Sequence, residues 1–434
     1  MKRIPLSTLI LTAIVIVLAA GLIGTLFFLR SQPPPQRGFT PLVEVAPMEP
    51  DSSVWGVNYP NQYSTFLLTA QNDTQTKYGG SKLISKLEQD PRLLTLFAGM
   101  AFSKEYNEDR GHMLSLQDVQ ETARVNETTP GTCYSCKSSS NPRLWAEMGP
   151  EAFYETKFFD LGNRVTTPIG CANCHEANTM RLIVTNPALQ QALEAQGKDW
   201  QTATRQEMRS LVCANCHVEY YFKGEGKHLT FPWSNGTGIE DIVTYYAEIG
   251  FADWKYPDAG TPMVKIQHPE YEMYTADSTH FRAGVACADC HMPYTRDGAA
   301  KFSTHDVKSP LLRAETACGA CHTDVTYVTD RVKRIQDQVH ETLIATEDAI
   351  IAAINAIKAA AADPNADTTV LDEARALHRE AQLRWDFVAA ENSMGFHNPA
   401  EALRILARAT DQARQAQLKA IQASPQALLA RAQP

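Results

Sequence analysis

The ten cysteines of this 434-residue chain all lie in C-x-x-C pairs, and no cysteine is left over. Four pairs are followed directly by a histidine, in the sequences CANCH, CANCH, CADCH and CGACH. Two thiols at this spacing with an adjacent histidine form the attachment site of c-type haem, since the thiols bond to the vinyl groups and the histidine binds the iron. The sequence therefore predicts four such sites, formed by Cys171, Cys174 and His175; Cys213, Cys216 and His217; Cys287, Cys290 and His291; and Cys318, Cys321 and His322.

Paired cysteines have other uses, which spacing alone leaves open. Zinc sites also contain C-x-x-C pairs, but they do not need a histidine directly after each second cysteine. A redox dithiol or a disulfide is compatible with an exported protein. Four repeats of the complete pentapeptide favour haem over these alternatives.

The fifth pair, Cys133 and Cys136, is followed by Lys137 instead of a histidine. It is either a degenerate site, with a plain dithiol, or a haem site whose iron is bound by the lysine amine. An amine binds a metal only when it is deprotonated, which burial and the metal together favour. One unusual haem among four ordinary ones predicts a division of labour, in which one haem does chemistry and the others carry electrons.

The composition excludes several classes of protein. With 44% hydrophobic and 21% charged residues, the chain is neither collagen-like nor a coiled coil, and it is not wholly disordered. Forty basic residues against 49 acidic ones give a net charge of −9. We therefore expect no nucleic-acid partner, because such proteins carry a basic surface.

The N-terminus carries an export signal. Met1-Lys2-Arg3 precedes a segment from Ile4 to Leu29 that contains no charged residue. As a helix this segment could cross a hydrocarbon core of about 30 Å, and the basic residues would keep its start in the cytoplasm. It exceeds the apolar part of a signal peptide, about 7–15 residues, so we favour an uncleaved anchor over a cleaved signal. Either way, the body is expected on the periplasmic or exported side of the cytoplasmic membrane.

We expect a mainly α-helical chain in three parts. Residues 1–37 form the anchor and a stiff Pro-rich spacer, 38–329 form the haem-carrying body, and 330–434 form a region of long helices. Helical patterns lie at Ser81–Glu88, Gln117–Arg124, Val332–Ala361, Val370–Ala390 and Pro399–Ala423. The Ala-rich helices of the last region could form a dimer interface or an intramolecular bundle.

The motif CYSCK followed by four CxxCH motifs resembles the pentahaem cytochrome c nitrite reductases, the ammonia-forming enzymes of the periplasm. The resemblance runs from about Phe102 to His397. It implies a multihaem c-type cytochrome fold with a haem-packed body and long C-terminal helices, five covalently bound haem c groups and one Ca²⁺. It also implies a distal ligand for each histidine-bound haem: His305 for the second, His112 for the third, His397 for the fourth and His280 for the fifth.

The same resemblance implies the residues of the active site and of the calcium site. Arg124, Tyr220 and His268 match active-site residues beside the haem of Lys137. The implied calcium ligands are Glu219, the carbonyls of Tyr220 and Lys265, and the side chain of Gln267. The chain departs from the family in the connection Val125–Thr132, which is shorter, and His228, His340 and His378 receive no role.

The activity that the resemblance implies is six-electron reduction of nitrite to ammonium, at a lysine-bound haem fed by four bis-histidine haems. The implied partners are nitrite, a quinol-linked membrane cytochrome as electron donor, and a second copy of the chain. One alternative is a membrane-anchored electron carrier without catalysis, in which Lys137 is a structural variation. Another is an enzyme directed at hydroxylamine or sulfite; the hydroxylamine oxidoreductases carry more than five haem motifs, which disfavours it.

We expect five covalent haems per chain, since four CxxCH motifs and one CxxCK motif are present. Mass spectrometry of the intact mature protein measures this number directly. A mass with four haems, with Cys133 and Cys136 free or joined by a disulfide, would remove the proposed active site.

Overall fold

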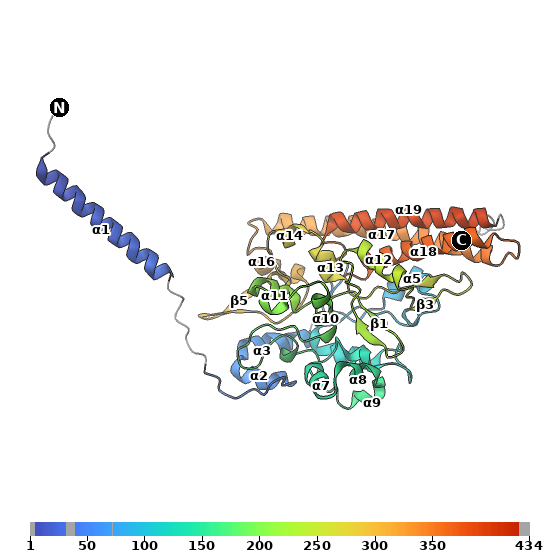
Figure 1. Ribbon diagram of the computed structural model, residues 1–434, viewed down its shortest axis with the longest axis horizontal. Coiled ribbons are helices and arrows are strands. Elements are labelled where there is room, and N and C mark those ends of the chain that lie inside the picture. Colours follow the sequence, from blue (N-terminus) through green and yellow to red (C-terminus); the bar gives the residue numbers. More distant parts are fainter. Residues whose placement is uncertain (1–4, 32–39, 72, 425–434) are drawn as a thin grey trace. The chain divides into compact units, whose positions relative to one another are not determined.

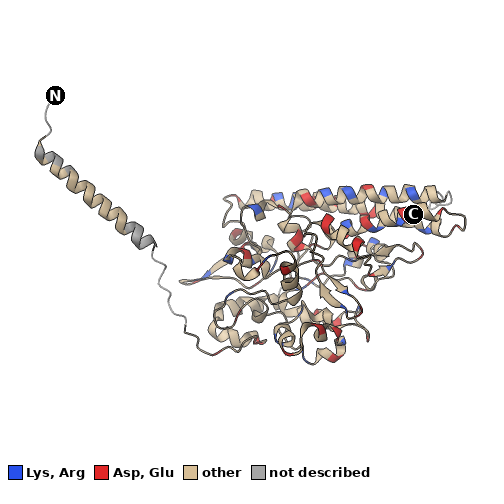
Figure 2. Cartoon of the chain, in the orientation of Figure 1, with Lys and Arg blue, Asp and Glu red and all other residues tan. Residues whose placement is uncertain are grey.

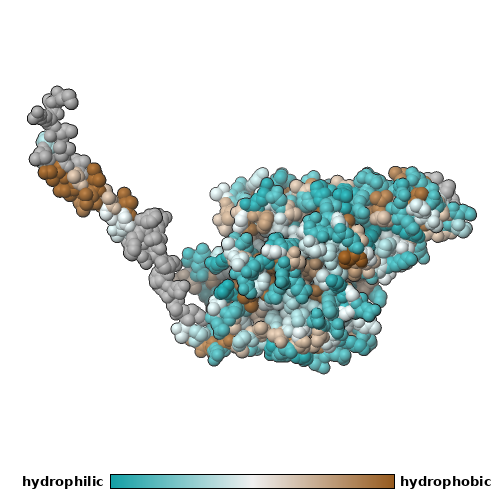
Figure 3. Space-filling model, viewed as in Figure 1, coloured by the Kyte–Doolittle hydropathy of each residue, from teal (hydrophilic) through white to brown (hydrophobic). Residues whose placement is uncertain are grey.

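The computed structural model describes residues 5–31, 40–71 and 73–424, and the chain divides into two units, 1–44 and 45–434. The first unit contains α1 (Leu6–Ser31), whose described side chains are mostly apolar (Figure 3). Within the described residues, no helix meets both the length and the apolarity that a membrane crossing requires. Residues 1–3 and most of the expected spacer, 32–37, lie outside the described residues.

The second unit is mainly helical (Figure 1). It forms one compact unit from Val45 onwards, so the expected division near residue 330 stays a prediction. Its helices before the C-terminal region are α2 (Ser52–Asn58), α3 (Pro60–Leu67), α4 (Lys86–Gln89), α5 (Arg92–Leu96), α6 (Ser115–Glu121), α7 (Asn141–Met148), α8 (Pro150–Glu155), α9 (Phe158–Gly162), α10 (Pro187–Ala195), α11 (Arg205–Leu211), α12 (Ile239–Glu248), α13 (Glu270–Thr275), α14 (Thr279–Arg282), α15 (Cys287–His291) and α16 (Ala314–Ala317).

Short antiparallel hairpins interrupt these helices in the described chain. Each pairs two strands that are neighbours in sequence, so no extended sheet is built from them. The strands are β1 (Tyr221–Lys223) with β2 (His228–Thr230), β3 (Trp254–Lys255) with β4 (Pro262–Met263), and β5 (Tyr294–Asp297) with β6 (Ala300–Ser303).

Three long helices, α17 (Val325–Ala361), α18 (Thr368–Ala389) and α19 (Pro399–Ala423), pack side by side along one edge of the second unit (Figure 1). Their contact faces are rich in buried alanine, which allows a close approach of the helices. Charged residues recur along all three helices (Figure 2), and most of them are at least partly exposed, whereas Glu347, Arg384 and Asp386 are buried. The mainly helical fold with long C-terminal helices is thus confirmed. The first helix begins at Val325 instead of Val332, because the side chain of Asp324 caps it by accepting from the backbone N–H of Tyr327.

The structure differs from the two short helices predicted near the start of the body. The expected helix Ser81–Glu88 is wrong, since only Lys86–Gln89 is helical. Ser85 forms a β-bridge with Asn107, and the Lys86 N–H donates to the Tyr106 carbonyl at 2.7 Å, so tertiary pairing overrides the local pattern. The expected helix Gln117–Arg124 is shifted and runs from Ser115 to Glu121.

A buried ion pair fixes the segment before α13 to the long helices. The ammonium group of Lys265 lies 2.9 Å from Oδ1 of Asp386 in α18, and each side chain is 1% exposed. The second carboxylate oxygen accepts from the backbone N–H of Ile266 at 2.9 Å. The rings of Phe97 and Phe102 also face the ammonium, at 5.1 and 4.9 Å from their centres. The position of residues 265–268 therefore depends on Asp386.

We expect Asp386→Ala to lower the free energy of unfolding by about 3–5 kcal/mol, because it leaves a buried ammonium without its carboxylate. Asp372→Ala, on the same helix, removes a carboxylate that is 71% exposed and pairs with Arg375. That control should cost at most about 1 kcal/mol. Denaturant unfolding of the haem-loaded proteins measures both values, and equal losses would contradict the role given to the buried pair.

Candidate functional site

Histidines predicted to share an iron face each other in three pairs. A histidine nitrogen binds a metal ion at about 2 Å, so two rings that share one ion from opposite sides have centres about 6 Å apart. The ring centres are 6.2 Å apart for His175 and His305, 6.2 Å for His291 and His397, and 6.4 Å for His280 and His322. The residues of each pair therefore fit a haem iron between them.

Hydrogen bonds at the other ring nitrogen orient most of these histidines. Nδ1 of each lies against a fixed acceptor, which leaves Nε2 for the metal, the arrangement common in protein metal sites. The distances are 3.0 Å from His175 to the Met180 carbonyl, 3.2 Å from His291 to the Lys308 carbonyl, 2.9 Å from His305 to the Ser303 carbonyl and 3.1 Å from His397 to the Glu391 carboxylate.

The fourth predicted pair, His217 and His112, is arranged differently. The ring in contact with His217 is that of His268, with centres 6.4 Å apart and nearly perpendicular planes. His112 is a near neighbour: burial lowers its pKa to about 4, and the positive charges of His217 and Lys137 act in the same direction. The assignment of His112 to His217 stays a prediction.

All ten cysteines lie in the described part of the chain, and none is in a disulfide. Contacts between cysteines of different motifs show which motifs are neighbours. Cys136 lies within hydrogen-bonding reach of Cys216, and Cys213 of Cys287. Cys290 lies close enough to Cys318 for the two thiols to interact electrostatically, which continues the row. The CYSCK motif is thus linked to the third, fourth and fifth motifs in succession.

Residues within and after the CYSCK motif fit a bound haem. Ser135, Trp145 and Tyr154 each have a buried hydrogen-bond donor without a partner in the described structure. Tyr154 also lies close enough to Cys136 for the two groups to interact electrostatically. Because haem carries two propionate groups, which accept hydrogen bonds, buried donors beside its attachment site suit it.

The three predicted active-site side chains come from separate segments and share neighbours. Nε of Arg124 donates to Thr122 Oγ1 at 3.2 Å, and its guanidinium stacks over Phe102 at 4.3 Å. Burial raises the pKa of Tyr220 well above its usual value; Cys136 and Cys133 add to the rise, whereas Arg124 opposes it. Tyr220 therefore lies near both Arg124 and the cysteines of the CYSCK motif.

His268 is flanked by two carboxylates. Its Nδ1 lies 3.9 Å from Asp109 Oδ2 and 3.9 Å from Glu270 Oε1. This nitrogen is buried and has no hydrogen-bond partner in the described structure. Burial lowers the pKa of His268, and the two carboxylates act in the opposite direction.

Asp109 is a site residue that the sequence analysis missed. Burial alone would raise its pKa, but the charges of His268, Lys137, Lys86 and Arg124 lower it below its usual value. The carboxylate thus lies among three of the predicted site residues. Its place three residues before His112 in the segment FSKEYNEDRGH was the available signal.

The predicted calcium ligands also lie together. Glu219 is fully buried; its carboxylate accepts from the Gln267 N–H at 2.6 Å and from the Tyr246 hydroxyl at 2.7 Å. The Gln267 side-chain amide lies 3.1 Å from the Lys265 carbonyl. Burial raises the pKa of Glu219 well above its usual range, and among the described ion pairs it takes part in none. A buried carboxylate beside a carbonyl and an amide suits a hard cation such as Ca²⁺.

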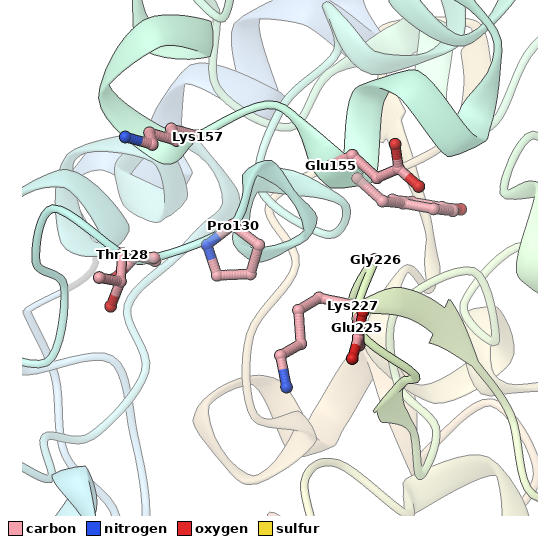
Figure 4. A pocket seen from close by; sticks show the side chains of 9 residues that line it. Thr128, Pro130, Glu155, Lys157, Glu225, Gly226 and Lys227 are labelled. Carbon is pink, nitrogen blue, oxygen red and sulfur yellow. The ribbon is translucent and has the colours of Figure 1, made fainter.

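The short connection Val125–Thr132 forms one wall of a surface pocket of about 370 Å³ (Figure 4). The turn between β1 and β2 forms another wall, and Oγ1 of Thr132 donates to the Lys227 carbonyl at 2.6 Å, which ties the two together. The pocket lies next to the CYSCK motif. Its lining residues are Thr128, Thr129, Pro130, Tyr154, Glu155, Lys157, Glu225, Gly226 and Lys227.

The histidines without a predicted role have local partners. His228 Nε2 lies 3.2 Å from the Glu155 carboxylate, and the His340 ring lies 4.8 Å from that of Tyr78. His378 is fully buried and bonds through Nδ1 with Thr261 Oγ1 at 3.0 Å. These contacts are of the kind that stabilise the fold.

Comparison with known proteins gives the family. The family described as Cytochrome c552 matches residues 51–433. Cytochrome c-552 of Bacteroides fragilis is 42% identical over 384 residues, which cover 87% of this chain and 78% of the relative. Cytochrome c-552 of Parabacteroides distasonis is 42% identical over 383 residues, covering 86% and 77%.

A solved structure agrees with this. The catalytic subunit (NrfA) of the cytochrome c nitrite reductase from Desulfovibrio desulfuricans, described with two calcium sites, matches with a TM-score of 0.84 and 34% identity. The match covers 89% of this chain and 88% of that subunit. The resemblance that the motifs indicate is therefore confirmed, and the chain belongs to the cytochrome c552 family of pentahaem nitrite reductases.

Proposed function

We propose that the chain reduces nitrite to ammonium, with six electrons, at the haem held by Cys133, Cys136 and Lys137. The observation that carries this proposal is the convergence of three separate segments on one carboxylate: Lys137, Arg124 and His268 all lie close to Asp109. A lysine ligand on one side and an arginine and a histidine nearby suit a site that binds a small anion.

The haem, when bound, supplies the open iron position and the path for electrons. Arg124 and His268 would then bind the nitrite oxygens, neutralise their charge and assist cleavage of the N–O bonds. The hydroxyl of Tyr220, held near Arg124, would position water and partly reduced nitrogen species. In a chain with a net charge of −9, these basic groups provide the local attraction that an anion needs.

The row of cysteine motifs supports delivery of electrons to this site. Contacts between Cys136 and Cys216, and between Cys213 and Cys287, bring successive haem-attachment sites together. An electron carrier would also need such a row. It would place no demand on Arg124, Tyr220 and His268, which is why substitution of these residues separates the two functions.

The calcium site would rigidify the substrate side, that is, the segments that carry Arg124, Tyr220 and His268. Its proposed ligands Glu219 and Gln267 directly precede Tyr220 and His268 in the sequence. A cation shared by both segments would therefore fix two active-site side chains relative to each other.

The protein belongs in the periplasm, as its family does. The uncharged N-terminal segment supports the further proposal that it is retained as a membrane anchor. We also propose a quinol-linked membrane cytochrome as donor, and a homodimer formed through the long helices α17–α19.

Replacing His268 or Arg124 by alanine should lower nitrite turnover by a factor of about 10²–10⁴, the range for a positioned acid–base or electrostatic group. Steady-state kinetics with a reduced dye as electron donor measures this. All five haems should stay attached and the bis-histidine spectra unchanged, since neither residue is proposed to bind iron. Turnover at the parental rate in both variants would favour the electron carrier.

Glu219→Gln should lower both bound calcium and nitrite turnover, because it removes the one charged ligand proposed for the cation. Elemental analysis of the purified protein reports calcium per chain. Glu225→Gln makes the same change of charge at the exposed turn between β1 and β2 and should leave both quantities unchanged. Full calcium content in Glu219→Gln would refute the assignment.

A further inference from the structure

Two carboxylates and two histidines meet near the predicted active site: Asp109 and Glu270 both lie 3.9 Å from His268, and Glu270 also lies near His217. Oε2 of Glu270 lies 3.6 Å from Nδ1 of His217, and its Oε1 accepts from the Asn392 side-chain amide at 2.7 Å. Glu270 is only 8% exposed. This carboxylate is therefore held between Asn392 and His217.

Asp109 is the other carboxylate near His268, and unlike Oε1 of Glu270, which accepts from Asn392, its Oδ2 is available to this ring. Its Oδ2 lies 3.9 Å from Nδ1 of His268, slightly beyond hydrogen-bonding distance. The buried Nδ1 of His268 has no hydrogen-bond partner in the described structure. Hydrogen bonds at an active site are often long before substrate binds and shorten in the complex.

The backbone around Asp109 is fixed on both sides. Before it, the Glu108 N–H donates to the Ile84 carbonyl at 2.9 Å. After it, Gly111 packs so closely on the Thr69 carbonyl that a Cβ at this position would collide with it. The segment therefore delivers the carboxylate to a defined place, and only its side chain is free to adjust.

We propose that Asp109 is a positioning residue that accepts a hydrogen bond from Nδ1 of His268 and so directs Nε2 towards the nitrite oxygens. The inference rests on the proposed function of His268. The bond formed by one ring nitrogen decides which nitrogen is presented to the reacting group. Asp109 itself touches neither the nitrite nor the iron.

A double-mutant cycle tests this. Asp109→Ala should lower kcat for nitrite about 10- to 100-fold, the usual cost of losing the partner of a functional histidine. Combined with His268→Ala, it should cause no further loss, because it acts through that ring. Asp109→Asn, which keeps the shape and a carbonyl oxygen, should lose less than Asp109→Ala.

A second readout does not depend on turnover. Optical titration of the oxidised protein with nitrite gives the affinity of the resting site, and the effects of Asp109→Ala and His268→Ala on it should again be non-additive. Asp277→Asn, which removes a charge from an exposed side chain, should match the parent in both measurements and controls for net charge.

The outcomes separate this inference from the function on which it rests. Full activity of His268→Ala would refute the proposed role of His268. A large loss in His268→Ala together with a normal Asp109→Ala would refute the inference alone. An additive loss in the double variant would also refute it, as would faster turnover in Asp109→Ala, which would show that the carboxylate repels the substrate.

Discussion

The arrangement of this chain depends on three pairs of imidazole rings whose centres lie 6.2–6.4 Å apart. Each pair joins residues from different parts of the sequence, so the backbone must bring both rings to one point and hold Nδ1 of most of them against an acceptor. A metal ion between two rings tolerates little variation in distance. The short helices and turns of the body are suited to this, because each sets the direction of one or two ligands.

The long helices extend this control to the substrate side. Asp386 of α18 holds Lys265 through a fully buried ion pair, which fixes the start of the segment that carries Gln267 and His268. After α18, Glu391 accepts from Nδ1 of His397 at 3.1 Å. Gly395 has a φ of +77°, which suits glycine, in the turn that leads to His397. One region thus supports both His397, the proposed ligand of the fourth haem, and His268, a proposed residue of the active site.

The sequence predicts the parts of this site whose chemistry is local. A CxxCH motif contains its thiols and its iron ligand within five residues, and the lysine in the fifth motif stands out in the same way. The long helices were also predictable from periodicity, apart from the start at Val325, which a side-chain cap decides. The helix expected at Ser81–Glu88 failed because Ser85 pairs with Asn107, a contact that periodicity does not reveal. Asp109 was missed for a similar reason: its contact with His268 joins distant segments, and its place three residues before His112 was the one local signal.

The carboxylates of Asp109 and Glu270 add negative charge at the substrate side. An anion must enter a protein with a net charge of −9, and a further carboxylate at the site opposes that entry. Asp109 lies close to the cations Lys86 and Arg124, which counter its negative charge. Glu108 lies 3.4 Å from Lys86 and partly balances it. If Lys137 binds the iron as proposed, Arg124 is the cation that remains to balance the incoming nitrite. Asp109 can thus act on His268 without making the site repulsive, provided that Arg124 keeps its charge close to the substrate.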